Sequence, residues 1–220
     1  MIPVAVISSK NTEKALPLQH EAWHDVWPMY SKYMSFCVYS STPQPGSMDL
    51  GSWMWKTLPS PSFGYAIRWI SKTLPSPFLL MMDDYIPVSV YPNRLIQAYG
   101  LGCADQGMMQ IRLLPCPPGT LHNNHLPVPH ISEIDPGAAY SLSFQAALWS
   151  GAFLREFVKE KDNPWAAEIE GSKRYAKSNL GWRSHAYDVN VLSYENLYRH
   201  GNLQELALKN CLDRGLTWTG

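Results

Sequence analysis

Five apolar residues without a polar break, Phe78–Met82, constrain most strongly how this chain folds. A short run without alternation is typical of a strand that is buried on both faces, as strands are inside a parallel sheet. Pro75 and Pro77 mark its start, because proline does not extend a preceding helix. Two carboxylates, Asp83 and Asp84, follow the run directly. The sequence therefore predicts a central parallel strand that ends in acidic side chains.

Length and composition favour a single compact domain over residues 1–220. Hydrophobic residues make up 45% of the chain and charged residues 16%, which is typical of a folded protein rather than a disordered one. A chain of 220 residues is long enough to build one good core. The formal net charge is zero, so no overall basic field attracts nucleic acid.

The cysteines and the apolar runs bear on the compartment. Cys37, Cys103, Cys116 and Cys211 show no Cys-x-x-Cys spacing, which fits scattered thiols in a reducing compartment. The N-terminus lacks a basic leader, and no apolar run approaches the roughly 20 residues that a membrane span needs. We therefore expect a cytoplasmic protein without a membrane span.

Polar side chains at two strand ends point to a ligand site. The segment Val4–Ser9 is predicted as a first buried strand, with Ser8 near its carboxyl end and a polar loop after it. In open α/β sheets, ligands bind beyond the carboxyl ends of the strands. Asp83 and Asp84 would suit Mn²⁺ or Mg²⁺, which prefer oxygen ligands and often bridge a phosphorylated substrate. The alternative is that the loop is an ordinary turn and the aspartates are loop or capping residues.

One segment matches a zinc-hydrolase pattern. His20-Glu21-Ala22-Trp23-His24 lies in a predicted helix over 17–33 and has the form His-Glu-x-x-His. On a helix both imidazoles share a face and could hold zinc, with Glu21 as a base. No sequence signal for a third ligand follows soon after, so this function is kept as an alternative.

The second half of the chain offers further candidates. A strand is predicted over Met108–Leu114, and its Arg112 would reach a phosphate or form an ion pair. The segment 115–136 is not periodic, and its His122, His125 and His130 fit no standard metal spacing. A helix is predicted over 144–159, a turn over 162–165 and a closing helix over 194–207. The helix over 144–159 would be capped by Ser143 and would carry Gln145 in its first turn, where an anion or a sugar hydroxyl binds.

Several segments together resemble a known family. They are Leu80-Met81-Met82-Asp83-Asp84-Tyr85, Arg112-Leu113, Tyr140-Ser141-Leu142-Ser143-Phe144-Gln145-Ala146-Ala147-Leu148-Trp149, Asn163-Pro164-Trp165-Ala166-Ala167-Glu168-Ile169-Glu170-Gly171-Ser172 and Tyr194-Glu195-Asn196. Their order resembles that of small bacterial and phage glycosyltransferases with a GT-A-like fold. The resemblance implies a Rossmann-like α/β domain with a mostly parallel central sheet flanked by helices.

The resemblance also implies roles for residues. The donor would be a nucleotide sugar, for example a UDP-sugar, and the acceptor would be a hydroxyl group. Asp83-Asp84-Tyr85 is similar to the family's Asp-x-Asp element but departs from it in spacing, so strict metal dependence is not implied. Glu168, which follows Trp165, would be the catalytic base of an inverting transfer. The expected donor-binding residues are Ser8, Asp83, Asp84, Arg112 and Gln145. The expected metal ligands are Asp83 and Asp84. The acceptor would be oriented by Ser143, Trp165 and Glu170.

The acceptor and the function class stay open at the level of sequence. The acceptor would be a glycan or a 5-hydroxymethylated pyrimidine in phage DNA. The DNA alternative would draw on a possible basic strip of Lys159, Lys161, Lys173, Arg174, Lys177 and Arg183. Beside the zinc hydrolase, a second alternative is a non-catalytic carbohydrate-binding module that uses the many aromatic residues, among them nine tryptophans and twelve tyrosines.

Overall fold

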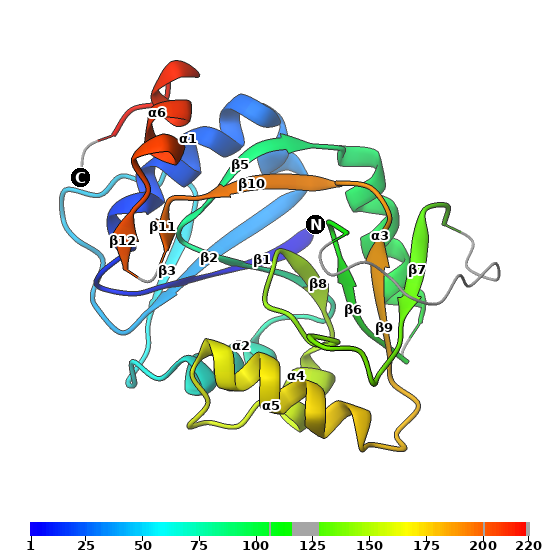
Figure 1. The fold of residues 1–220 in the computed structure, drawn as a ribbon. Helices are drawn as coiled ribbons and strands as arrows, with labels where there is room; N and C mark the ends of the chain where they lie inside the picture. The colour runs from blue at the N-terminus through cyan, green and yellow to red at the C-terminus, as the bar shows by residue number, and fades with distance from the viewer. Residues whose placement is uncertain (106, 116–127, 200, 219–220) are drawn as a thin grey trace.

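An eight-stranded sheet organises the molecule (Figure 1). The computed structural model describes residues 1–105, 107–115, 128–199 and 201–218, so His122 and His125 lie outside the described residues. The strand order is β3-β2-β1-β4-β8-β6-β9-β7. All neighbouring pairs from β3 to β4 are parallel, as is β6 with β9, whereas β8 and β7 are antiparallel to their neighbours. The predicted class, a mostly parallel α/β sheet flanked by helices, is confirmed.

The strands of this sheet are β1 (Ile2–Ser8), β2 (Met34–Ser40), β3 (Met54–Thr57), β4 (Phe78–Met82), β6 (Met108–Arg112), β7 (Ile131–Ile134), β8 (Ala147–Trp149) and β9 (Arg183–Tyr187). Two small antiparallel ribbons accompany it: β5 (Tyr85–Val90) with β10 (Leu192–Asn196), and β11 (Tyr198–Arg199) with β12 (Asn202–Leu203).

Helices cover both faces of the sheet (Figure 1). On one face lie α2 (Phe63–Thr73), α4 (Gly151–Phe157) and α5 (Pro164–Ala176), and on the other lie α1 (Leu16–Val26) and α3 (Pro92–Ala104). The last helix, α6 (Glu205–Asp213), packs near α1 through a smaller cluster that includes Leu18, Ala22 and Cys211. Short 3-10 helices cover Glu13–Ala15 and Tyr30–Lys32. No helix in the described ranges is long and apolar enough to cross a membrane.

The predicted central strand is confirmed, and its pattern has a simple cause. Successive side chains of a strand point to opposite faces. In β4, Leu79 and Met81 therefore join the core under α1 and α3, whereas Phe78 and Leu80 join the core under α2 and α4. Because both faces are covered, the strand needs apolar residues at every position.

The helix predicted over 144–159 is wrong in its first half. Ala147–Trp149 forms β8, which pairs with both β4 and β6, and only Gly151–Phe157 is helical. Three buried apolar residues fit a helical stripe and a buried strand equally well, and the pairing with two neighbours selects the strand.

Two further predictions are corrected. The turn predicted over 162–165 is the start of α5: Asn163 is its N-cap, with Oδ1 accepting from the Ala166 N–H at 2.8 Å, and Pro164 occupies the first turn. Asn and Pro at these two positions are favourable helix-start residues. The closing helix predicted over 194–207 is instead mostly strand, in β10, β11 and β12, before α6 begins at Glu205.

Candidate functional site

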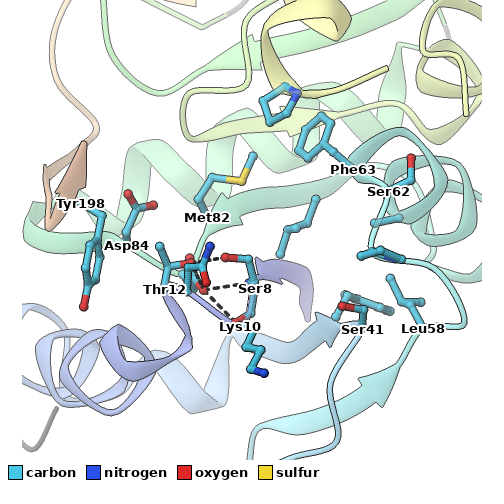
Figure 2. Close-up of a pocket in the computed structure, with 18 of the residues that line it drawn as sticks. Ser8, Lys10, Thr12, Ser41, Leu58, Ser62, Phe63, Met82, Asp84 and Tyr198 are labelled. Atoms are coloured by element: carbon cyan, nitrogen blue, oxygen red, sulfur yellow. Dashed lines mark hydrogen bonds between the residues drawn. The ribbon is translucent and has the colours of Figure 1, made fainter. Parts of the chain in front are cut away.

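A cavity of about 730 Å³ opens at the carboxyl ends of β1 and β4. Figure 2 shows Asp84 and Tyr198 on one side of it and Leu58, Ser62 and Phe63 on the other. Pro164 and Trp165, at the start of α5, also line it. The cavity therefore lies where ligands bind in open α/β sheets, between the strand ends and the helices that cover one face.

Asp83 ties the two strand ends together. Its backbone N–H donates to the Ile7 carbonyl at 3.0 Å, which brings it beside Ser8. Its Oδ2 accepts hydrogen bonds from Ser8 Oγ at 2.7 Å, from the Ser9 N–H at 3.2 Å and from Thr12 Oγ1 at 2.7 Å (Figure 2). Burial raises the pKa of Asp83 to about 7, although these hydrogen bonds act in the opposite direction. Asp83 thus fixes the loop after β1.

Asp84 faces the cavity more openly. Burial raises its pKa to about 6, while backbone N–H groups, including that of Tyr198, favour the charged form. The turn that carries both aspartates is itself held from beneath. The buried Gln19 of α1 donates from Nε2 to the carbonyls of Met82 and Tyr85, at 2.8 Å in each case. Asp84 is therefore a carboxylate that the fold holds at the cavity wall.

The carboxylates at the cavity decide whether the protein could hold a divalent cation there. Within the described ranges, no three His, Cys, Asp or Glu side chains gather into a group that could hold a metal ion. Asp83 has one oxygen occupied by three protein donors, which leaves Asp84 as the better ligand. Mg²⁺ is commonly bound by only one or two carboxylates together with substrate phosphates. Among the described lining residues, the carboxylate that could best ligate such a cation at the cavity is that of Asp84.

Glu168 is fixed by the segment that precedes β8. Its Oε1 accepts from Ser143 Oγ at 3.0 Å and from the Phe144 N–H at 2.6 Å. The Tyr85 hydroxyl, next to Asp84 in sequence, donates to the Phe144 carbonyl at 3.4 Å. Glu168 stands one helical turn after Trp165, and Trp165 lines the cavity. The Tyr85 hydroxyl therefore links the segment that holds Glu168 to the turn that carries Asp84.

The backbone of this segment is held by buried side chains from two elements, β6 and α5. Arg112 of β6 donates to the Tyr140 carbonyl, and Gln110 donates to the Ser141 carbonyl at 2.9 Å. Ser172 of α5 accepts from the Leu142 N–H at 3.0 Å. β6 and α5 thus fix the segment that orients Glu168.

The predicted site residues fall into two groups. Ser8, Asp83, Asp84 and Trp165 line the cavity, and Ser143 contacts Glu168. Glu168 itself does not line it. Nor do the others: Arg112 is fully buried beneath Tyr140, Gln145 precedes β8, and Glu170 forms an exposed ion pair with Lys173 at 2.7 Å.

Most cavity residues were not among the sequence-based candidates, and three of these bear on its chemistry. Lys10 is the basic side chain among the described lining residues, Thr12 holds Asp83, and Tyr198 stands beside Asp84. The polar loop after β1 was a usable signal for Lys10 and Thr12. Tyr198 gave none, because its segment was predicted as a helix.

The His-Glu-x-x-His segment does not form a complete zinc site among the described residues. His20 and His24 do share a face of α1, with ring centroids 5.0 Å apart. Burial and the neighbouring His24 lower the pKa of His20. Glu21 accepts a hydrogen bond from the Thr217 N–H at 2.7 Å, so it holds the C-terminal segment. The described residues bring no third metal ligand to the pair.

Comparison with known proteins shows the fold. No family model and no curated protein matches the sequence. Among solved structures, S. aureus TarS 1–349 in complex with UDP-GlcNAc matches with a TM-score of 0.57 and 14% identity, over 92% of this chain and 60% of that chain. TarS alone and TarS with UDP each match with a TM-score of 0.54 and 13% identity, over 88% of this chain. The chain therefore has the GT-A type of fold and spans 60% of the length of the matched TarS chain.

Proposed function

We propose that this protein is a glycosyltransferase that moves a sugar from a nucleotide-sugar donor to a hydroxyl acceptor. One observation carries the proposal: Asp84 and the first two residues of α5, Pro164 and Trp165, border one cavity at the carboxyl ends of β1 and β4, and Glu168 follows Trp165 by one helical turn. The fold shared with TarS, whose structures include UDP and UDP-GlcNAc complexes, supports a UDP-sugar as the first donor to test.

The proposed reaction is a single displacement. Glu168 Oε1 is occupied by Ser143 and Phe144, so Oε2 is the oxygen assigned to take the acceptor's hydroxyl proton. The acceptor oxygen forms a bond to the anomeric carbon while the bond from that carbon to the diphosphate oxygen breaks. The diphosphate leaves with the bonding electron pair. Without a carboxylate nucleophile, one displacement inverts the anomeric configuration.

The leaving diphosphate needs positive charge. Lys10 lines the cavity and can approach a phosphate, and Asp84 is the residue that would hold Mn²⁺ or Mg²⁺. A bound cation would act as a Lewis acid on the diphosphate oxygens. Tyr198, beside Asp84, and Ser8 would contact the rest of the donor.

Glu168→Gln tests the base directly. The amide keeps the size of the side chain but accepts no proton, so transfer should fall by about 10²- to 10⁴-fold, the usual contribution of a positioned base. Donor binding should remain near the wild-type level. Rates are measured by release of nucleoside diphosphate with UDP-GlcNAc and a panel of other nucleotide sugars, and binding is measured by calorimetry.

Glu156→Gln is the matched control, because Glu156 is an exposed glutamate on neighbouring α4. It should behave as wild type. Full activity in Glu168→Gln would remove Glu168 from the mechanism, and failure of every nucleotide sugar to bind the wild-type protein would remove the proposed function.

A further inference from the structure

A second hollow, of about 350 Å³, lies along α5 and is separate from the donor cavity. It is bounded by residues 136–140, which follow β7, and by Ile169, Ser172, Lys173 and Ala176 of α5. We call it the α5 groove. Its volume is at the lower end of the range for small-ligand sites, about 300–1,000 Å³. Neither the proposed donor nor the proposed base occupies it.

The α5 groove and the donor cavity are separate hollows, but both are bordered by residues of α5. Trp165 lines the cavity, and Ile169, four residues later, lines the groove. Residues four apart on a helix are neighbours on one face. Both side chains are exposed, Trp165 to 55% and Ile169 to 41%. Glu168 lines neither hollow, but it lies about one helical turn from Trp165 of the cavity and from Ser172 of the groove, so it stands between the two.

Tyr140 is held at the groove by a strained backbone. Its φ is 55°, a left-handed conformation that residues other than glycine rarely adopt. Buried Arg112 donates to its carbonyl, and Gln110 fixes the next residue, Ser141. The residue nevertheless stays 46% exposed. Strain that persists because buried partners enforce it is a feature of ligand sites, and here it sets an aromatic ring against the groove.

The charges around the groove favour a neutral ligand. Lys173 is the basic residue that lines it, and Lys173 is already paired with Glu170 at 2.7 Å. Two further members of the basic strip considered for DNA binding are also paired, Arg174 with Asp162 at 2.5 Å and Arg183 with Asp105. DNA affinity depends on cations that neutralise phosphates, and three of the six cations of the strip, Lys173, Arg174 and Arg183, are already in ion pairs.

We propose that the α5 groove binds the acceptor, and that the acceptor is a neutral glycan rather than DNA. The apolar faces of its sugar rings pack on Trp165, Ile169 and Tyr140, and this packing presents a hydroxyl to Glu168. The assignment of the glycan as acceptor rests on the proposed function, whereas saccharide binding in the groove does not.

The test uses the full chain with an array of neutral oligosaccharides and a DNA duplex that contains 5-hydroxymethylcytosine. The best-bound saccharide is then titrated against Ile169→Ser and Tyr140→Ala. Each variant should raise its Kd about tenfold, since packing against an aromatic or aliphatic anchor contributes on that scale. The matched control is Ile96→Ser, because Ile96 is an isoleucine of α3 with a similar exposure of 37%. Thermal unfolding verifies that all three variants are folded.

The outcomes separate the two proposals. The groove assignment is overturned if no neutral saccharide binds, if both groove variants bind like Ile96→Ser, or if the DNA duplex binds instead with a steep loss of affinity in salt. If the groove assignment is overturned but nucleotide sugars still bind, the glycosyltransferase proposal stands without the groove. If a saccharide binds through the groove but no nucleotide sugar binds, the groove is supported and the protein is a carbohydrate-binding module.

Discussion

At the scale of single residues, Asp83 makes stability depend on pH. Burial raises its pKa from 3.8 to about 7, and burial likewise raises that of Asp84 to about 6. Between about pH 4 and pH 7 the folded chain therefore binds more protons at these sites than the unfolded chain does. Stability from this source is fully present below about pH 4 and is lost as the pH rises to about 7.

Asp83→Asn should remove most of that pH dependence. The amide cannot ionise, and its oxygen can still accept from the Ser9 N–H. The free energy of unfolding of the variant, relative to wild type, should be higher at pH 8 than at pH 5 by a few kcal/mol, since one pKa unit corresponds to about 1.4 kcal/mol. Urea unfolding across this range, in buffer with a chelator, measures the difference. A constant difference at all pH values would contradict the raised pKa.

At the scale of elements, the start of α2 is packed directly on the segment that leads into α5. A Cβ on Gly64 would lie 2.0 Å from the Lys159 carbonyl oxygen and 2.8 Å from that of Glu160. Gly64→Ala should therefore destabilise the protein by about 1–3 kcal/mol, the usual cost of overpacking. It should also lower transfer activity, because the displaced segment carries α5 and Glu168.

Gly100→Ala is the matched helical control. Gly100 lies inside α3, and a Cβ there would meet no atom within 4 Å. Alanine is favoured over glycine in a helix by roughly 0.5–1 kcal/mol, so this variant should be slightly more stable. Denaturant titration measures the free energy of unfolding of both variants. If it changes equally in Gly64→Ala and Gly100→Ala, the close approach at Gly64 is relieved without cost.

The elements also show how far sequence reasoning reaches. The sequence predicts β4 correctly, because its burial on both faces leaves a local signature in five consecutive apolar residues. β8 leaves no such signature: Leu148 becomes part of a strand through pairing with Leu79 and Ile111, which are distant in sequence. The closeness of Ser8 and Asp83 follows from the rule for parallel strand ends. The contact of Glu168 with Ser143 depends on the position of α5, which local sequence does not encode.

At the scale of the whole molecule, the proposed donor site joins parts that are far apart in sequence. The cavity is lined by the ends of β1 and β4, the start of α5, and Tyr198. A ligand that contacts all four binds only the folded chain, so it must raise the stability of the fold. At a concentration of 100 times Kd the gain is about 2.7 kcal/mol. For a chain of this size each kcal/mol raises Tm by about 2–4 °C, so the expected shift is about 5–11 °C.

Asp84→Ala tests whether the rise in Tm on ligand binding depends on the Asp84 carboxylate. With a nucleotide sugar and Mn²⁺ present, we expect most of the Tm shift to disappear in this variant, because the cation and the diphosphate lose their protein carboxylate. Asp213→Ala is the control, since Asp213 lies in an exposed pair with Lys209 that contributes little to stability. A shift that persists undiminished in Asp84→Ala would mean that Lys10, not a cation at Asp84, neutralises the diphosphate. Repeating the measurement with a chelator distinguishes these cases, because a shift that depends on Lys10 survives removal of the metal.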